Sequence, residues 1–357
     1  MRQMIKNISL LLLAAATIVS CHRKPIYDTC ICENTLAIPI SIDWTTSGID
    51  LQNVTVLFYD AADSTLQYEH KYEHNDNDIQ SYVYLPEGSY TAVVFNELRD
   101  QIDYVSCVGY DNLSTLKFES NGDTPLRSRS STRSYVKESG DLAVKVIEGI
   151  EITEAMIIEA AGASTDEDGT KALSAETRAT VDALTGVMPL KKNTLVCITA
   201  YIDNIWYALM SLVDLVNMAD GYYVDGDQNS STTSTLQFTM NNRTYNEDSE
   251  LDGYITDTIT TFGTLTDRLS TSGHDSSTPI TLDILFQMVD NETTQSIVID
   301  NLADYTFTQE EQSDGSVLIE IVVEGSLEPV TPADSDGDSG FGSTVKDWED
   351  VVSVPLS

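Results

Sequence analysis

Short runs rich in β-branched and aromatic residues, each bounded by Gly, Asp, Asn or Pro, recur along almost the whole chain. Runs of this kind are typical of β-strands, and many of them at regular spacing indicate an all-β fold. One short helix is expected at 151–162, started by Thr153, and the polar stretch 163–179 is expected to be a loop. The expected strands are 36–44, 54–60, 81–86, 89–97, 104–110, 114–120, 142–148, 180–192, 194–203, 234–240, 254–265, 280–289, 295–300 and 316–325.

The N-terminus has the layout of a secretory signal. Arg2 and Lys6 precede an apolar run, 8–19, that is too short to cross a bilayer comfortably. The sequence "IVSC" that follows resembles the lipobox of bacterial lipoproteins, which implies cleavage before Cys21 and its acylation; an ordinary signal peptide is the alternative. Several acyl chains anchor a protein stably. Because His22 rather than Asp follows Cys21, we expect lipid anchoring in the cell outer membrane, with the side it faces left open.

The strand pattern and the length together predict two antiparallel β-sandwich domains with minor helices. Residues 1–20 are the expected signal peptide and 21–34 a tether. The N-terminal sandwich is predicted at 35–190 and the C-terminal sandwich at 191–330. Residues 331–357 are predicted to form a flexible linker and a terminal strand.

The charge excludes one class of function. The chain has 57 Asp and Glu against 19 Lys and Arg, and its formal net charge is −38. A chain this acidic repels phosphate backbones, and no basic stripe offsets the repulsion, so we expect no nucleic-acid partner.

The cysteines beyond Cys21 predict no metal site. Cys30 and Cys32 are too close in sequence to pair easily with each other, and a four-cysteine zinc site would need a second close pair. Cys107 and Cys197 lie in apolar runs and are predicted to be buried thiols. The disulfide state of all four stays open.

The stretch "HKYEH" (70–74) matches the reversed signature of zinc peptidases. Strict alternation over 66–74 predicts a strand instead, on which His70 and His74 lie about 13 Å apart and cannot share a metal ion. The run "GDSG" (337–340) and the Asp-rich stretch around it match a protease turn and a calcium loop only in part. We therefore expect no catalytic residue, no metal, no cofactor and no enzymatic activity.

Two further segments are candidate functional sites. The loop "RSRSSTR" places Arg127, Arg129 and Arg133 together in an acidic chain, where an arginine-specific protease could cut; an exposed loop paired with acidic neighbours is the alternative. After an Asp/Gly/Ser-rich spacer, the last segment carries alternating apolar side chains. This candidate donor strand could complete the sheet of another subunit, or fold back on its own sheet. Its alternating residues are Trp348, Val352, Val354 and Leu356.

Several of these motifs occur together in one known family. The lipobox, "LPEGSYTAVVFNE", "FTMNNRTYNED" followed by "ITTFGT", and the terminal "STVKDWEDV" are similar to fimbrillin-superfamily lipoproteins. The chain most resembles the FimB-like anchor and accessory subunits of type V pili. The resemblance implies two transthyretin-like β-sandwiches, a lipidated precursor, and other fimbrial subunits as partners.

The sequence thus favours a non-catalytic, lipid-anchored envelope protein. We expect an anchor, tip or accessory subunit of a fimbrium that acts through strand complementation and serves cell adhesion. The alternative is a surface lipoprotein outside any pilus that binds glycans or host proteins through aromatic side chains. Trp206 and Tyr207 are candidates for that role, although packing in the core also explains them.

Overall fold

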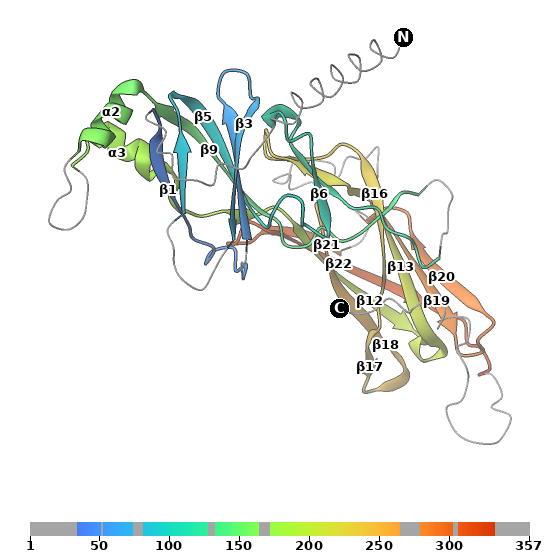
Figure 1. The fold of residues 1–357 in the computed structure, drawn as a ribbon. Coiled ribbons are helices and arrows are strands. Elements are labelled where there is room, and N and C mark those ends of the chain that lie inside the picture. Colours follow the sequence, from blue (N-terminus) through green and yellow to red (C-terminus); the bar gives the residue numbers. More distant parts are fainter. Residues whose placement is uncertain are drawn as a thin grey trace, which may run out of the picture. The chain divides into compact units, whose positions relative to one another are not determined.

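The computed structural model describes residues 34–50, 53–73, 81–127, 133–163, 172–264, 279–302 and 306–332. Most of these residues lie in strands (Figure 1), so the expected all-β fold is confirmed. The helices are α2 (Glu154–Gly162) and α3 (Ala175–Val181), with single 3₁₀ turns at η1 (Leu113–Thr115), η2 (Asp182–Leu184) and η3 (Ile205–Tyr207). The strands are β1 (Leu36–Ile42), β2 (Asn53–Asp60), β3 (Leu66–Glu73), β4 (Ser81–Leu85), β5 (Gly88–Asn96), β6 (Val105–Val108), β7 (Lys117–Ser120), β8 (Tyr135–Val136), β9 (Ala143–Ile152), β10 (Thr185–Val187), β11 (Leu190–Lys191), β12 (Thr194–Asp203), β13 (Ala208–Ala219), β14 (Gly221–Tyr223), β15 (Gln228–Asn229), β16 (Thr233–Thr239), β17 (Asn242–Asn246), β18 (Ser249–Thr261), β19 (Thr281–Met288), β20 (Thr294–Ile299), β21 (Thr306–Glu311) and β22 (Val317–Ser326).

The first sandwich packs a three-stranded sheet, β10-β1-β4, against a five-stranded sheet, β11-β9-β5-β2-β3. Alternate residues of β1 point into the space between them, and Leu36 and Ile38 are fully buried there against Val56 and Phe58 of β2. Alternating burial of this kind is what the period-2 pattern of the sequence predicts.

The other face of the five-stranded sheet is also buried. Leu57 and Phe95 lie on this face and pack against Phe118 and Tyr222, which belong to a four-stranded sheet, β15-β14-β7-β6. The rings of Phe95 and Phe118 meet edge to face with their centroids 5.0 Å apart. Because both faces are covered, β2 and β5 read as nearly continuous apolar runs.

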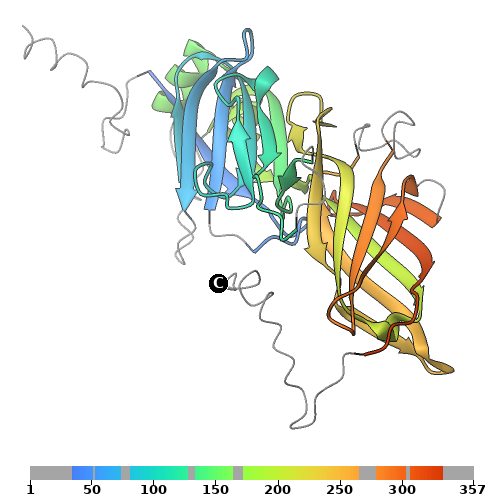
Figure 2. The ribbon, with the colours of Figure 1, turned by 90° about the vertical axis from the view of Figure 1, so that its right-hand side faces the viewer.

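The second sandwich consists of two five-stranded sheets, β17-β18-β12-β22-β21 and β20-β19-β13-β16-β8 (Figure 2). Its core is mostly aliphatic, with Ile198 of β12, Val213 of β13 and Ile284 of β19 all at zero exposure. Most pairs are antiparallel, but β12 pairs with β22 in parallel over its whole length.

Two strand pairs connect residues that lie on opposite sides of the predicted domain boundary near residue 190. Strand β8 precedes the boundary and pairs with β16, whereas β14 follows it and pairs with β7. Accordingly, the described chain from Leu36 onward forms one compact unit. The domain limits remain predictions.

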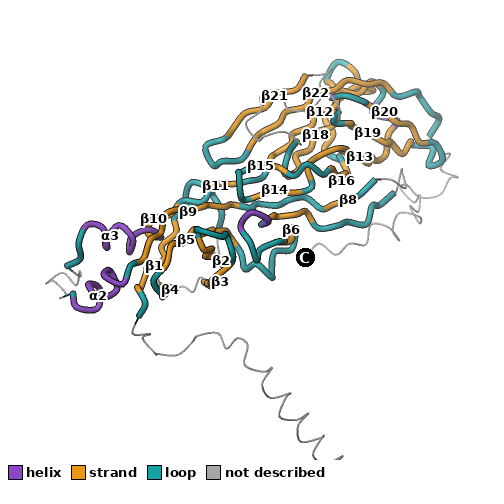
Figure 3. The backbone as a smooth tube through the Cα atoms, turned by 90° about the horizontal axis from the view of Figure 1, so that it is seen from above, coloured by secondary structure: helices purple, strands orange, loops and turns teal. Residues whose placement is uncertain are grey.

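The helices lie beside β1 and β10, as Figure 3 shows in purple. Helix α2 begins after Thr153, whose side chain accepts a hydrogen bond from the backbone of Met156, as predicted. Two other predictions were wrong here. Part of the expected loop 163–179 is helix α3, capped by Ser174, and the expected strand 180–192 is divided into η2 and the short strands β10 and β11.

Candidate functional site

The arginine segment 127–133 ends on the outer face of the second sandwich. The guanidinium of Arg133 pairs with Asp214 of β13, which has zero exposure, and lies 3.6 Å from a carboxylate oxygen of Asp283 on β19. Asp214 also accepts hydrogen bonds from the Tyr135 hydroxyl at 3.3 Å and from the side-chain amide of Gln237 at 2.7 Å. A cation from one part of the chain thus neutralises two buried carboxylates of another part.

At the start of the same segment, the backbone of Arg127 is hydrogen-bonded to the side chain of Gln237. The N–H of Arg127 donates to the side-chain oxygen of Gln237 at 3.1 Å, and the amide of Gln237 donates to the carbonyl of Arg127 at 2.9 Å. The Arg127 side chain itself is exposed, whereas that of Arg133 is largely buried by its ion pairs. Protease access to this loop stays a prediction.

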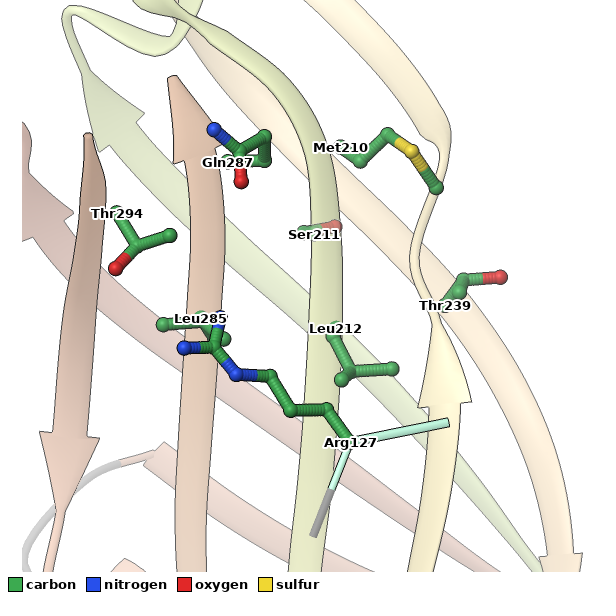
Figure 4. A pocket seen from close by; sticks show the side chains of 8 residues that line it. All are labelled: Arg127, Met210, Ser211, Leu212, Thr239, Leu285, Gln287 and Thr294. Carbon is green, nitrogen blue, oxygen red and sulfur yellow. The ribbon is translucent and has the colours of Figure 1, made fainter. Parts of the chain in front are cut away.

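Beside Arg127 lies a shallow groove on the outer face of β13, β16, β19 and β20 (Figure 4). In Figure 4 the Arg127 side chain extends over the sheet towards Leu285 and Leu212, which form an apolar floor. The groove is lined by Arg127, Met210, Ser211, Leu212, Thr239, Leu285, Gln287 and Thr294. Ser211 is buried and donates its hydroxyl proton to the carbonyl of Met240, and no lining residue is a His, Asp or Glu that could act as a base. The lining of this groove lacks the pair of groups that acid–base catalysis requires.

Residues 70–73 of the zinc-peptidase motif lie on strand β3, as predicted. His70 is on β3, its ring nitrogen is 2.8 Å from the Ser81 hydroxyl, and burial lowers the pKa of the imidazole. His74 lies outside the described residues. Within the described ranges, no group of three or more His, Cys, Asp or Glu is placed to hold a metal ion.

The two aromatic candidates differ in exposure. Tyr207 packs against the core of the second sandwich. Trp206, next to it, is 54% exposed and lies against the ring of Tyr245.

Several predicted site residues lie outside the described part of the chain. They are Cys21, Arg129, Trp348, Val352, Val354 and Leu356. Their assignments stay predictions. Among the described elements, no helix is long and apolar enough to cross a membrane.

Sequence reasoning missed the two carboxylates beneath Arg133. Asp214 and Asp283 are single acids inside the apolar runs "SLVDLV" and "ITLDILF". An acid in such a run is rarely buried without a cationic partner. That signal, together with the arginine loop, could have predicted the ion pairs.

A family model described as a domain of unknown function, DUF5119, matches residues 20–239. No curated protein sequence matches the chain.

Several solved bacterial structures are similar to this chain. A candidate adhesin from Bacteroides ovatus ATCC 8483 matches with a TM-score of 0.53 and 15% identity, over 88% of this chain and 99% of that one. The fimbrial anchor protein Mfa2 from Porphyromonas gingivalis matches at 0.39 and 12%, over 81% of this chain and 90% of that one. The tip fimbrial protein Mfa3 from the same organism matches at 0.35 and 8%, over 74% and 81%. The first match shows that this chain shares the fold of that protein.

Proposed function

Because the chain belongs to the DUF5119 family, whose description states no function, we propose one: a non-catalytic, lipid-anchored envelope protein that serves as an anchor, tip or accessory subunit of a fimbrium. The observation that carries the proposal is the fold, which is shared over nearly the full length of a protein described as a candidate adhesin. The role in adhesion comes from that description and from the motifs that resemble fimbrillin lipoproteins.

The anchor in this proposal is Cys21. It follows an apolar signal and stands in "IVSC", where diacylglycerol transfer to the thiol and acylation of the new amine would hold the protein in the outer membrane. Substitution Cys21→Ser is expected to move the protein from the membrane fraction to the soluble fraction and to abolish palmitate labelling. Cys107→Ser is the matched control and should leave both unchanged. Palmitate labelling of the Cys21→Ser chain at the level of the parent would remove the lipid anchor from the proposal.

The contact with other subunits is proposed to be strand complementation by residues 344–357. Trp348, Val352, Val354 and Leu356 share one parity, so on a strand they would enter pockets of a neighbouring sheet while the backbone supplies hydrogen bonds. Deleting residues 331–357 should release pilus material from cells. A second variant keeps the full length of the segment but replaces these four residues with Ser. Comparing the two variants distinguishes the effect of the apolar side chains from the effect of the length of the segment. Unchanged retention of pilus material in both variants would eliminate donor-strand docking.

A further inference from the structure

Trp206 is exposed on a turn that is otherwise rigid and packed. In η3, the side chain of Ile205 has zero exposure and seals the end of the second sandwich. Trp206 contributes little to that core, since 54% of it remains exposed to solvent. Tryptophan, with a large apolar body and a polar N–H, is enriched at binding surfaces.

The turn is fixed by hydrogen bonds on both sides. Asn204 adopts the left-handed conformation, with φ of 64°. Its backbone N–H donates to the Asp252 carboxylate at 3.1 Å and its side-chain amide donates to the carbonyl of Leu327 at 2.9 Å. The N–H of Tyr207 closes the turn on the carbonyl of Asn204 at 3.0 Å. The backbone that carries Trp206 is therefore held in place before any ligand arrives, which reduces the entropy cost of binding.

A second ring completes the surface. Tyr245, on the edge strand β17, is 41% exposed, and its ring centroid is 5.5 Å from that of Trp206 at an angle of 57° between the planes. The guanidinium of Arg243 bonds the carbonyl of Ala208, so strand β17 is tied to the end of this turn. Figure 1 shows β17 and β18 at this end of the second sandwich. We call Trp206 and Tyr245 the aromatic pair.

The charges around the aromatic pair select the kind of ligand. Exposed polar side chains on the same segments are Asp203, Asn246, Glu247 and Asp248. Their carboxylates, in a chain of net charge −38, repel anions such as lipid phosphates. Arg243 shares a face of β17 with Tyr245, because residues two apart on a strand point the same way. This positive charge partly offsets the neighbouring carboxylates and weakens their attraction for a cation stacked on the pair.

A neutral ligand with both an apolar face and hydroxyl groups fits these constraints. A pyranose ring has C–H groups that pack on aromatic faces, and its hydroxyls can donate to the carboxylates and to the amide oxygen nearby. A protein partner would need a wider apolar surface than two rings with a polar rim. We propose that the aromatic pair is a binding site for neutral carbohydrate. The site is independent of the proposed fimbrial function, because binding by the purified chain needs no pilus.

The test uses the full chain purified in detergent. It is applied to a printed array of neutral and acidic oligosaccharides and run in native gels containing yeast mannan or barley β-glucan. We expect at least one neutral glycan to bind. Trp206→Ala should weaken that binding by about 30-fold, the loss typical of a truncated central tryptophan. Trp206→Phe, which keeps a ring, should retain most of it.

Tyr201 supplies a matched control. It is 49% exposed and lies 5.5 Å from Tyr254, centroid to centroid, on the same sheet. Tyr201→Ala should leave binding unchanged. Thermal unfolding of each variant shows whether it is folded. The proposal is overturned if no neutral glycan binds, if Trp206→Ala binds as tightly as the parent, or if only acidic glycans or lysine-rich peptides are retained.

Discussion

Asp214 and Asp283 lie directly opposite each other on the neighbouring strands β13 and β19, and the guanidinium of Arg133 contacts both carboxylates. Like charges placed opposite each other on a sheet are destabilising. Arg133 comes from the segment that leads into β8, the edge strand of the same sheet, and it compensates this repulsion across the outer face of that sheet. The acidic pair thereby ties the arginine segment to the second sandwich.

Arg133→Ala should therefore be strongly destabilising. The substitution leaves two buried carboxylates without their cation, and we expect a loss of about 3 kcal/mol in the free energy of unfolding, as is typical when one partner of a buried pair is removed. Urea denaturation followed by tryptophan fluorescence measures it. Lys145→Ala, on an exposed position of β9, is the control and should change stability by less than about 0.5 kcal/mol.

A double variant tests whether the repulsion is the cause. In Arg133→Ala with Asp214→Asn one carboxylate of the pair is removed, so the double variant should be more stable than the sum of the two single changes predicts. Simple additivity would show that Arg133 acts through packing alone.

The strands that alternate were predictable, and so were β2 and β5, which are covered on both faces but are rich in β-branched and aromatic residues; β13 was not. Strand β3 shows strict alternation and was expected almost to the residue. Strand β13 was missed, because Val213 and Leu215 face the core while Leu212 and Asp214 are buried on the outer face. A strand covered on both faces loses the period-2 signal.

Helix α3 was missed because its support is tertiary. The carboxylate of Glu159, on α2, accepts hydrogen bonds from Ser174 and Thr177 at the start of α3. Ser174 also caps the helix. The Ser174 cap can be predicted from neighbouring residues in the sequence. The contact of Glu159 with Ser174 and Thr177, which are more than a dozen residues away, cannot. The parallel pairing of β12 with β22 depends on partners even farther apart in sequence.

The hydrogen bond from Lys117 to Asp220 should make stability depend on pH. Burial alone would raise the pKa of Asp220, but hydrogen bonds from Thr232, Lys117 and Ser230 hold that pKa below its ordinary value of 3.8. A carboxyl group whose pKa is lower in the folded than in the unfolded state stabilises the fold. This contribution is fully present at pH values above the pKa of the group in the unfolded chain. This contribution is lost as the pH falls through the folded pKa.

Lys117→Met isolates that contribution. Lys117 is nearly buried and bonds Asp220 at 2.9 Å, which joins β7 to the loop before β14. We expect the variant to be less stable by about 1–3 kcal/mol at pH 7. The deficit should be smaller at about pH 3, below the ordinary pKa of Asp220, where the stability that comes from its depressed pKa is already being lost. Urea denaturation at the two pH values gives the difference. A deficit that grows on acidification would contradict this assignment, and Lys145→Met is the matched control.

The junction of β7 and β14 should not accept a methyl group at Gly221. A Cβ there would lie 2.5 Å from the Cε of Lys117 and 2.5 Å from the carbonyl oxygen of Phe118. Gly221→Ala should cost about 2 kcal/mol through overpacking, measured by denaturation. Gly122→Ala is the control, because a Cβ at Gly122 meets nothing within 4 Å. Equal stability of the two variants would show that the junction can relax.

The thiol of Cys107 should be chemically inert in the folded protein. Burial raises its pKa to about 12, with Glu69 adding to the shift and Arg99 opposing it. At pH 8 only about one molecule in ten thousand then carries the reactive thiolate. Iodoacetamide at pH 8, followed by peptide mass mapping, should therefore leave Cys107 unmodified in the folded chain and alkylate it quickly in urea. Equally fast alkylation in both states would contradict this prediction. Because the buried thiol carries almost no thiolate, such a rate would mean that the strand pair β6–β7 opens often enough to expose Cys107 to the reagent.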